Sequence, residues 1–294
     1  MGAMTHSIHH SEPVRYRSFR KTLNTVLFWI ILFPVAVVTI MPIVYMLSQA
    51  FSPESETMVW PIRWIPLHPT VENFTRIFND PTLPVLHWFA NSMFVSTTIT
   101  VLVLFLSSLA AYGYARLEFP GREAIFFTLI VSLMIPAAVT LIPVFLLMRD
   151  LNILDTYHAL IWPAGASVGG IFLLRQHFYG IPKELEEAAV VDGASRFWVY
   201  WHVCLPLVKG ALVTQGIFTF LGSWNDLFWP LIVLSDRMNL TLPVGLLILN
   251  QGSYVQRGLA MAGAVLATIA PVILYAFFQR QIVSGIATTG LGGR

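Results

Sequence analysis

Long stretches without any charged side chain constrain this chain more than any other feature of its sequence. Five stretches cover residues 22–53, 81–115, 124–148, 156–174 and 258–279, and a sixth, residues 210–235, is interrupted only by Asp226. An ionised side chain at the bilayer centre costs several kcal/mol, and a spanning helix needs about 20 apolar residues. The pattern therefore predicts an all-α polytopic membrane protein with six transmembrane helices.

The composition excludes a water-soluble fold and several kinds of site. Hydrophobic residues make up 56% of the chain and charged residues 11%, compared with about 25% charged residues in soluble domains. The net charge of +2 leaves no dense basic patch that could bind nucleic acid. The single cysteine, Cys204, excludes a disulfide framework and a multi-thiolate metal site.

The uncharged stretches predict the domain organisation. A cytoplasmic N-terminal tail (residues 1–21) precedes a single transmembrane domain (residues 22–294). We expect its helices at about residues 22–50, 88–115, 124–148, 156–178, 208–234 and 258–279, with a cytoplasmic loop at residues 180–206 and a C-terminal tail at residues 280–294. The first stretch is far longer than the apolar region of about 7–15 residues in a signal peptide, so we expect it to remain as a helix.

The basic residues predict the orientation. With both termini in the cytoplasm, 12 of the 17 Lys and Arg residues fall in inner segments. The outer segments hold Arg63, Arg76, Arg149, Arg237 and Arg257. Because cytoplasmic loops carry an excess of Lys and Arg, this distribution favours a multi-pass protein of the cytoplasmic membrane with both termini inside.

The inner segment around residues 179–206 concentrates charge in a chain that otherwise avoids it. Its charged residues are Lys183, Glu184, Glu186, Glu187, Asp192 and Arg196. Pro182 suits the first turn of a helix, acidic residues near that end favour the helix dipole, and Gly193 allows the helix to stop. Small residues such as Ala188 allow close approach of another surface. The segment is typical of a docking helix, although an ordinary solvated helix is an open alternative.

The segment has a fixed order of residues. Glu187-Ala188-Ala189 is followed by three residues, Gly193, nine residues, Val203, one residue and Leu205-Pro206. This order resembles the EAA loop of ATP-binding-cassette importer permeases. The family pattern has Ile at the position of Val203. Further similar segments include Asn91-Ser92, Tyr114-Ala115-Arg116, Asp155-Thr156 and Trp224-Asn225-Asp226. The chain is most similar to the carbohydrate-uptake branch, in particular to the shorter, six-helix permease of maltose-type systems.

This resemblance implies a transporter subunit rather than an enzyme. Such a subunit would translocate a sugar or sugar-like solute that an external solute-binding protein delivers, in the inner membrane of a prokaryote. The loop would form a coupling helix that contacts the ATPase through Glu184, Glu187, Ala188, Ala189, Asp192 and Gly193. The chain has no G-x-x-x-x-G-K-S/T motif, so ATP and Mg²⁺ would be bound by partner subunits and this chain would hold no cofactor. The implied partners are a second homologous permease subunit, an ATPase dimer, the binding protein and membrane lipid.

The fifth predicted helix carries a polar stripe. Gln215, Thr219, Ser223 and Asp226 recur at helical spacing, and Asn225 adjoins them. Polar groups that face lipid lose water without gaining partners, at about 1–3 kcal/mol each. We therefore expect these five residues to line the translocation path; a hydrogen-bond cluster against a neighbouring helix is the alternative.

Two other functions stay open at this point. A secondary, ion-coupled transporter would use intramembrane acids, and Asp226 is the one acid inside a predicted span. A permease for a non-sugar solute is the other alternative, because apolar helices carry Trp and Tyr for membrane reasons too. A metal enzyme is disfavoured, since the 8 His residues are scattered and form no H-E-x-x-H motif.

Overall fold

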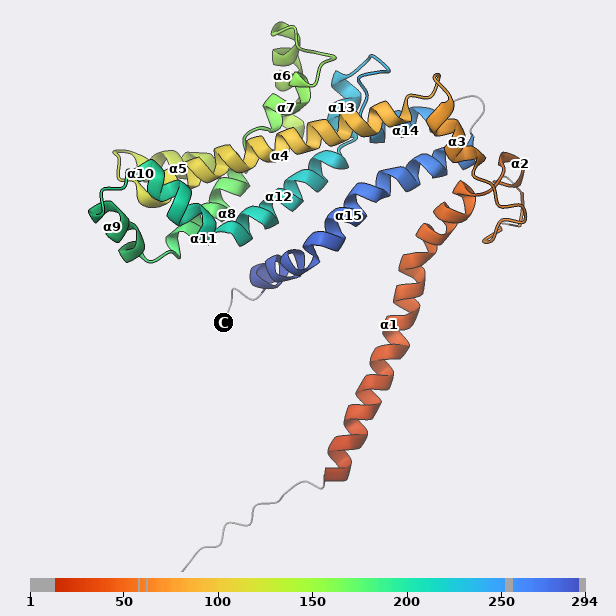
Figure 1. The fold of residues 1–294 in the computed structure, drawn as a ribbon, viewed down its shortest axis with the longest axis horizontal. Coiled ribbons are helices and arrows are strands. Elements are labelled where there is room, and N and C mark those ends of the chain that lie inside the picture. Colours follow the sequence, from red (N-terminus) through yellow and green to blue (C-terminus); the bar gives the residue numbers. More distant parts are fainter. Residues whose placement is uncertain (1–13, 58, 62, 252–255, 291–294) are drawn as a thin grey trace, which may run out of the picture.

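The computed structural model describes residues 14–57, 59–61, 63–251 and 256–290, and all regular secondary structure within them is helical (Figure 1). The longest helices are α1 (Val14–Ala50), α4 (Val85–Arg116), α12 (Lys209–Trp224) and α15 (Arg257–Gly290). The shorter ones are α2 (Glu54–Thr57), α3 (Glu72–Asn79), α5 (Arg122–Ser132), α6 (Ala137–Asp150), α7 (His158–Ala164), α8 (Val168–Tyr179), α9 (Lys183–Val191), α10 (Arg196–Val199), the π-helical η1 (Tyr200–Cys204), α11 (Leu205–Leu207), α13 (Phe228–Val233) and α14 (Leu242–Gln251).

Helix α4 is the centre of the bundle, with α8 and α12 packed along it and α15 packed against α12 and α1. Small side chains allow this close approach: Ser107, Ser108 and Ala111 of α4 are buried, and Gly216 of α12 lies against Leu104. Helices α9 and α10 lie at one end of α4, and α2 and α3 lie at the other (Figure 1). Each end of α4 therefore carries its own group of short helices.

Three helices in the described residues are long and apolar enough to cross a membrane: Phe28–Ala50, Val85–Arg116 and Arg257–Gln281. Two bent pairs raise this number to as many as five, namely Arg122–Ser132 with Ala137–Asp150, bent by 99°, and Arg196–Leu207 with Lys209–Trp224, bent by 78°. The chain is thus an all-helical membrane protein. Six crossings stay a prediction.

Three predicted helices are interrupted in the structure. The stretch 124–148 is divided into α5 and α6 at Pro136. Proline lacks the N–H that a helix interior needs, and it disfavours the helical conformation of the residue before it. The stretch 156–178 is divided into α7 and α8 before Ser167, whose hydroxyl caps α8 by accepting from the Gly170 amide. The stretch 208–234 ends as α12 at Trp224 and resumes as α13. The charge pattern could not reveal these breaks because they leave the hydropathy unchanged.

Helices extend into both predicted tails. Helix α1 already begins at Val14, inside the predicted tail 1–21, and α15 continues to Gly290, inside the predicted tail 280–294. Residues 1–13 and 291–294 lie outside the described residues. Phe28, Phe33 and Val38 of α1 are exposed, which is typical of a surface that contacts lipid or another protein in the membrane.

The segment after α1 fastens it to α15. The Glu54 carboxylate accepts hydrogen bonds from the first amides of α15, those of Arg257 at 2.7 Å and Gly258 at 3.0 Å. The Asn73 side chain donates to the Ala50 and Ser52 carbonyls, both at 2.9 Å. A carboxylate at a helix N-terminus is stabilised by the helix dipole. These contacts hold the ends of the two long helices together on the side of α2 and α3.

Candidate functional site

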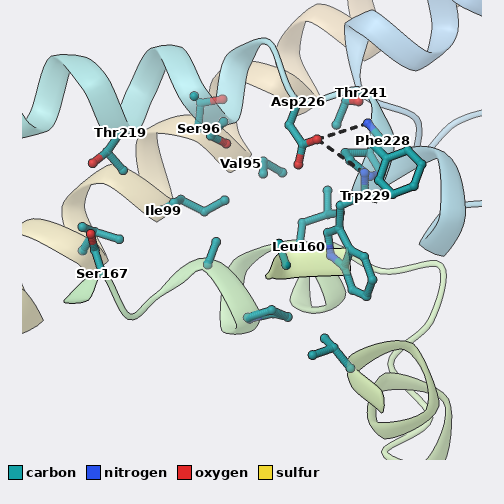
Figure 2. A pocket seen from close by; sticks show the side chains of 18 of the residues that line it. Val95, Ser96, Ile99, Leu160, Ser167, Thr219, Asp226, Phe228, Trp229 and Thr241 are labelled. Carbon is teal, nitrogen blue, oxygen red and sulfur yellow. Dashed lines mark hydrogen bonds between the residues drawn. The ribbon is translucent and has the colours of Figure 1, made fainter. Parts of the chain in front are cut away.

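A cavity of about 650 Å³ lies between α4, α6, α7, α12 and α13 (Figure 2). Most of its wall is aliphatic, including Val95, Ile99 and Leu160. Its polar lining consists of Ser92, Ser96, Thr140, Ser167, Thr219, Ser223, Asp226 and Thr241. Small-molecule sites have volumes of about 300–1,000 Å³ and combine apolar walls with a few polar groups. The cavity has both properties.

Asp226 is held in place by backbone amides where the chain turns from α12 to α13. Its Oδ1 accepts from the Phe228 amide at 3.1 Å and the Trp229 amide at 3.4 Å. This geometry is typical of an Asp that caps a helix start. The second carboxylate oxygen points away from these amides, toward the cavity (Figure 2). Asp226 therefore has one oxygen bound by the fold and one oxygen on the cavity side.

The structure divides the polar stripe that the sequence predicts. Thr219, Ser223 and Asp226 line the cavity. Gln215 does not; it is buried against α8, where a Cβ on Gly170 would come within 1.8 Å of its Nε2. Asn225 is exposed, and its amide donates to the Leu221 carbonyl at 2.9 Å. Gln215 thus lies in a contact between α12 and α8, and its amide makes no hydrogen bond within the described residues.

Sequence reasoning missed the part of the cavity wall that comes from other segments. Ser92 and Ser96 are four residues apart on α4, a spacing that places both on one helix face and that could have been noticed. Ser167 and Thr241 lie in segments between helices, where no periodic pattern exists. Their approach to α12 depends on tertiary packing, so the local sequence carries no signal for it.

Hydrogen bonds from α4 fix the segment that carries Thr241. The Asn91 side chain donates to the carbonyls of Met238, at 2.7 Å, and Leu240, at 2.9 Å. The Ser92 hydroxyl accepts from the Leu242 amide at 2.8 Å. Asn91 also accepts from the Tyr157 hydroxyl at 2.7 Å. The Asn91-Ser92 pair therefore positions one wall of the cavity.

The second candidate site is the outer surface of α9. Of the residues predicted to contact an ATPase, Glu184, Glu187, Ala188, Asp192 and Gly193 are exposed, and Ala189 is half-buried. Gly193 has a φ of +88°, a conformation that L side chains rarely adopt, and nothing lies within 4 Å of the position of an added Cβ. Val191 is 86% exposed on the same short helix. The surface thus combines acidic, small and apolar side chains that α9 leaves uncovered.

The opposite face of α9 is anchored to α4 by a buried ion pair. Glu186 Oε1 lies 2.7 Å from Arg116 Nε, and the two side chains are only 6% and 4% exposed. The Arg116 guanidinium also donates to the Ile181 carbonyl. The sequence shows Glu186 as one of several acids in this segment, but it does not predict that the Glu186 side chain points inward. The ion pair therefore ties α9 to the end of α4, the central helix of the bundle.

The Arg175 side chain connects three helices at the same end of the bundle. The Arg175 guanidinium of α8 donates to Glu123 Oε1 at 2.7 Å and lies 3.8 Å from the centre of the Phe126 ring. Its Nε donates to the Tyr114 carbonyl at 3.2 Å. Arg175 therefore links α8 to α5 and α4, beside the anchor of α9.

Within the described residues, no group of three or more His, Cys, Asp or Glu side chains could hold a metal ion.

Comparison with known proteins places these features in context. Residues 103–288 match the family described as binding-protein-dependent transport system inner membrane component. The chain is 35% identical to the arabinooligosaccharides transport system permease protein of Halalkalibacterium halodurans, over 88% of this chain and 93% of that protein. It is 32% identical to the trehalose/maltose transport system permease protein of Thermococcus litoralis, over 88% and 93%.

The structure also resembles a solved transporter. A chain from the crystal structure of a bacterial ABC transporter involved in the import of the acidic polysaccharide alginate aligns with a TM-score of 0.78 and 25% identity. The alignment covers 92% of this chain and 99% of that chain. The similarity thus extends over almost the whole membrane bundle.

Proposed function

The chain belongs to the family of binding-protein-dependent transport system inner membrane components, and from this we propose that it is the permease subunit of an ATP-driven sugar importer. The observation that carries the proposal is the near full-length similarity to permeases named for arabinooligosaccharides and for trehalose and maltose. An external binding protein delivers the solute, as the family description implies. The cavity between α4 and α12 is a part of the path.

Besides the external binding protein, the proposed complex has three kinds of partner. A second permease subunit completes the membrane part, and lipid surrounds it. An ATPase dimer binds the exposed surface of α9 and supplies ATP and Mg²⁺ chemistry, since this chain carries no phosphate-binding motif. The Arg116–Glu186 pair supports this assignment, because it provides a rigid link from the docked helix to α4. Motion of the ATPase would then reach the cavity wall through α4, which carries Ser92 and Ser96.

The proposed topology has six crossings and both termini in the cytoplasm. The crossings are α1, α4, the pair α5 and α6, the pair α7 and α8, the pair α12 and α13, and α15. Helix α9 and its neighbours are the cytoplasmic end, and α2 and α3 are the outer end. The placement of α9 and α2 at opposite ends of α4 supports this assignment (Figure 1). The excess of basic residues in the segments assigned inside supports it as well.

The docking role of α9 predicts that Glu187→Lys and Gly193→Val uncouple the ATPase. A charge reversal that places like charges together costs several kcal/mol, and each 1.4 kcal/mol is about tenfold in affinity. Valine at a φ of +88° strains the loop, with a penalty of about 1–2 kcal/mol or more. We expect at least a tenfold loss of ATPase that co-purifies with the membrane-inserted chain, and a matching loss of solute-stimulated ATP hydrolysis.

Gly193→Asn is the matched control, because Asn tolerates the left-handed conformation at the same exposed position. It should retain most of the ATPase. Full ATP-driven uptake in both the Glu187→Lys and Gly193→Val variants would remove α9 as the docking surface.

The topology predicts the side from which single cysteines react. Native Cys204 is fully buried, so the unaltered chain should not react with a membrane-impermeant thiol reagent and serves as the background. Exposed cysteines introduced at Glu72 and Arg237 should be labelled in intact cells, and cysteines at Glu118 and Glu184 only after the membrane is opened. Labelling of the Glu184 variant from outside would overturn both the orientation and the docking role.

A further inference from the structure

Two buried hydroxyls in the cavity wall have no partner among the described residues. Ser96 Oγ on α4 and Thr241 Oγ1 before α14 make no hydrogen bond, and the residues are 1% and 4% exposed. Both line the cavity (Figure 2). Buried polar atoms are nearly always hydrogen-bonded, so each exception requires an explanation. An occupant of the cavity with hydroxyl groups explains both.

Neighbouring hydroxyls on α4 show that the pairing rule otherwise holds there. Ser92 Oγ accepts from the Leu242 amide, Thr100 Oγ1 donates to the Ser96 carbonyl at 2.7 Å, and Ser108 Oγ lies 2.8 Å from the Tyr200 hydroxyl. Ser96 and Thr241 are therefore exceptions among these buried hydroxyls, and both belong to the cavity wall. The buried Gln215 amide also makes no hydrogen bond within the described residues, but it lies outside the cavity and carries no part of the inference.

The charge of the cavity limits what it can bind. Among the residues that line it, Asp226 is the only charged one, with no Lys, Arg or His. One carboxylate oxygen is held by the Phe228 and Trp229 amides, and the other remains as an acceptor on the cavity side (Figure 2). An anionic solute would meet an unbalanced negative charge. A neutral solute can donate a hydroxyl proton to that oxygen.

The apolar wall adds a surface for a carbon ring. Val95, Ile99 and Leu160 form aliphatic contacts, and Trp229 is fixed in orientation because its Nε1 donates to the Ala159 carbonyl at 2.9 Å. Aromatic and aliphatic surfaces bury the C–H faces of a ring, while hydroxyls at its edge need donors and acceptors. The wall supplies the face contact and Ser96, Thr241 and Asp226 supply the edge contacts.

We infer that this cavity is a solute-binding site within this subunit, selective for an uncharged polyhydroxylated ring over an acidic one. Ser96 and Thr241 are its specificity-determining hydroxyls, and Asp226 is its hydrogen-bond acceptor. The inference rests on the proposed function and deepens it, because it assigns the solute class and places recognition in this chain. The selectivity would also distinguish this chain from the structurally similar transporter, which is involved in the import of the acidic polysaccharide alginate.

The test measures equilibrium binding of radiolabelled trehalose, a neutral disaccharide, to the complete membrane complex in nanodiscs without the external binding protein. An unsaturated digalacturonate of similar size is the acidic probe. A single neutral hydrogen bond is worth about a two- to tenfold change in affinity. Ser96→Ala and Thr241→Val should each weaken trehalose binding by this factor, and the unaltered complex should not bind the acidic probe.

Two further measurements separate recognition from folding. Because Ser96 and Thr241 lack partners in the fold, removing either hydroxyl should leave the thermal stability of the solute-free complex unchanged or raised, whereas a structural hydroxyl would lower it. The control is Thr100, which lies outside the cavity and whose hydroxyl donates to the Ser96 carbonyl. Thr100→Val should keep wild-type trehalose affinity. Asp226→Asn retains an acceptor for the Phe228 amide and should reduce the discrimination against the acidic probe.

Each outcome bears on the inference. Unchanged trehalose affinity in both hydroxyl variants, or binding of the acidic probe as tight as that of trehalose to the unaltered complex, overturns it. Absence of trehalose binding to the unaltered complex also overturns it. The proposed function is tested separately by ATP-dependent uptake, which fails if the chain is not a sugar permease and persists if only the site assignment is wrong.

Discussion

Replacing Arg116 by Met should prevent α9 from holding its place against the bundle. The substitution leaves the Glu186 carboxylate buried without its partner, 2.7 Å from where the guanidinium was. Breaking a buried ion pair in this way costs about 3–5 kcal/mol. We expect a strongly reduced yield of folded chain, a lower melting temperature of the purified complex and loss of the bound ATPase.

The double variant Arg116→Met/Glu186→Met tests whether the unpaired Glu186 charge causes the loss of stability. Replacing both charges by apolar side chains of similar volume is often neutral or stabilising, so it should recover most of the lost stability. Arg149→Met is the matched control, since Arg149 pairs with Asp150 at 2.9 Å on the surface, where both side chains are more than half exposed. A surface pair contributes only about 0–1 kcal/mol. Equal melting temperatures for Arg116→Met and Arg149→Met would contradict the anchoring role.

Gly245→Ala should destabilise the end of the bundle that carries α2 and α3. A Cβ at Gly245 of α14 would lie 2.1 Å from Cε3 of the Trp88 ring. The ring cannot move easily, because Trp88 is fully buried and its Nε1 donates to the Arg237 carbonyl at 2.7 Å. Overpacking of this kind costs about 1–3 kcal/mol, occasionally more. The melting temperature of the detergent-solubilised complex measures the effect.

Gly113→Ala is the control, because this substitution should not lower the stability of the bundle. Gly113 lies within α4, and nothing lies within 4 Å of the position of its Cβ. Alanine is favoured over glycine in a helix by roughly 0.5–1 kcal/mol, so this variant should be as stable as the parent or slightly more stable. If Gly245→Ala proved as stable as Gly113→Ala, the close packing of α14 on Trp88 would be wrong.

The coarse features of the fold could be predicted because they depend on hydropathy alone. The uncharged stretches 22–53, 81–115 and 258–279 correspond to α1, α4 and α15, and these are the helices long enough to span a membrane in the described residues. The family recognised from the spacing around Glu187 is confirmed by the matched family model. The prediction of a transporter component rather than an enzyme is confirmed by that match and by the relatives.

Finer features depend on contacts between distant segments and could not be predicted. The stripe on α12 is a local pattern, but whether Gln215 meets α8 or the cavity depends on Gly170, which leaves room for its amide. Thr241 reaches the cavity through hydrogen bonds between Asn91 and a segment about 150 residues away in the chain. On α9, helical spacing shows which residues share a face. It does not show that the face of Glu186 meets Arg116.

The most direct test of the account is uptake of a labelled neutral oligosaccharide, such as trehalose or arabinotriose, into proteoliposomes that contain this chain with its partner permease, ATPase and binding protein. For an ATP-driven permease, uptake should require ATP on the internal face and the binding protein, and it should continue when proton and sodium gradients are collapsed. Uptake that continues without ATP and stops when an ion gradient is collapsed would contradict it and would favour an ion-coupled transporter that uses Asp226.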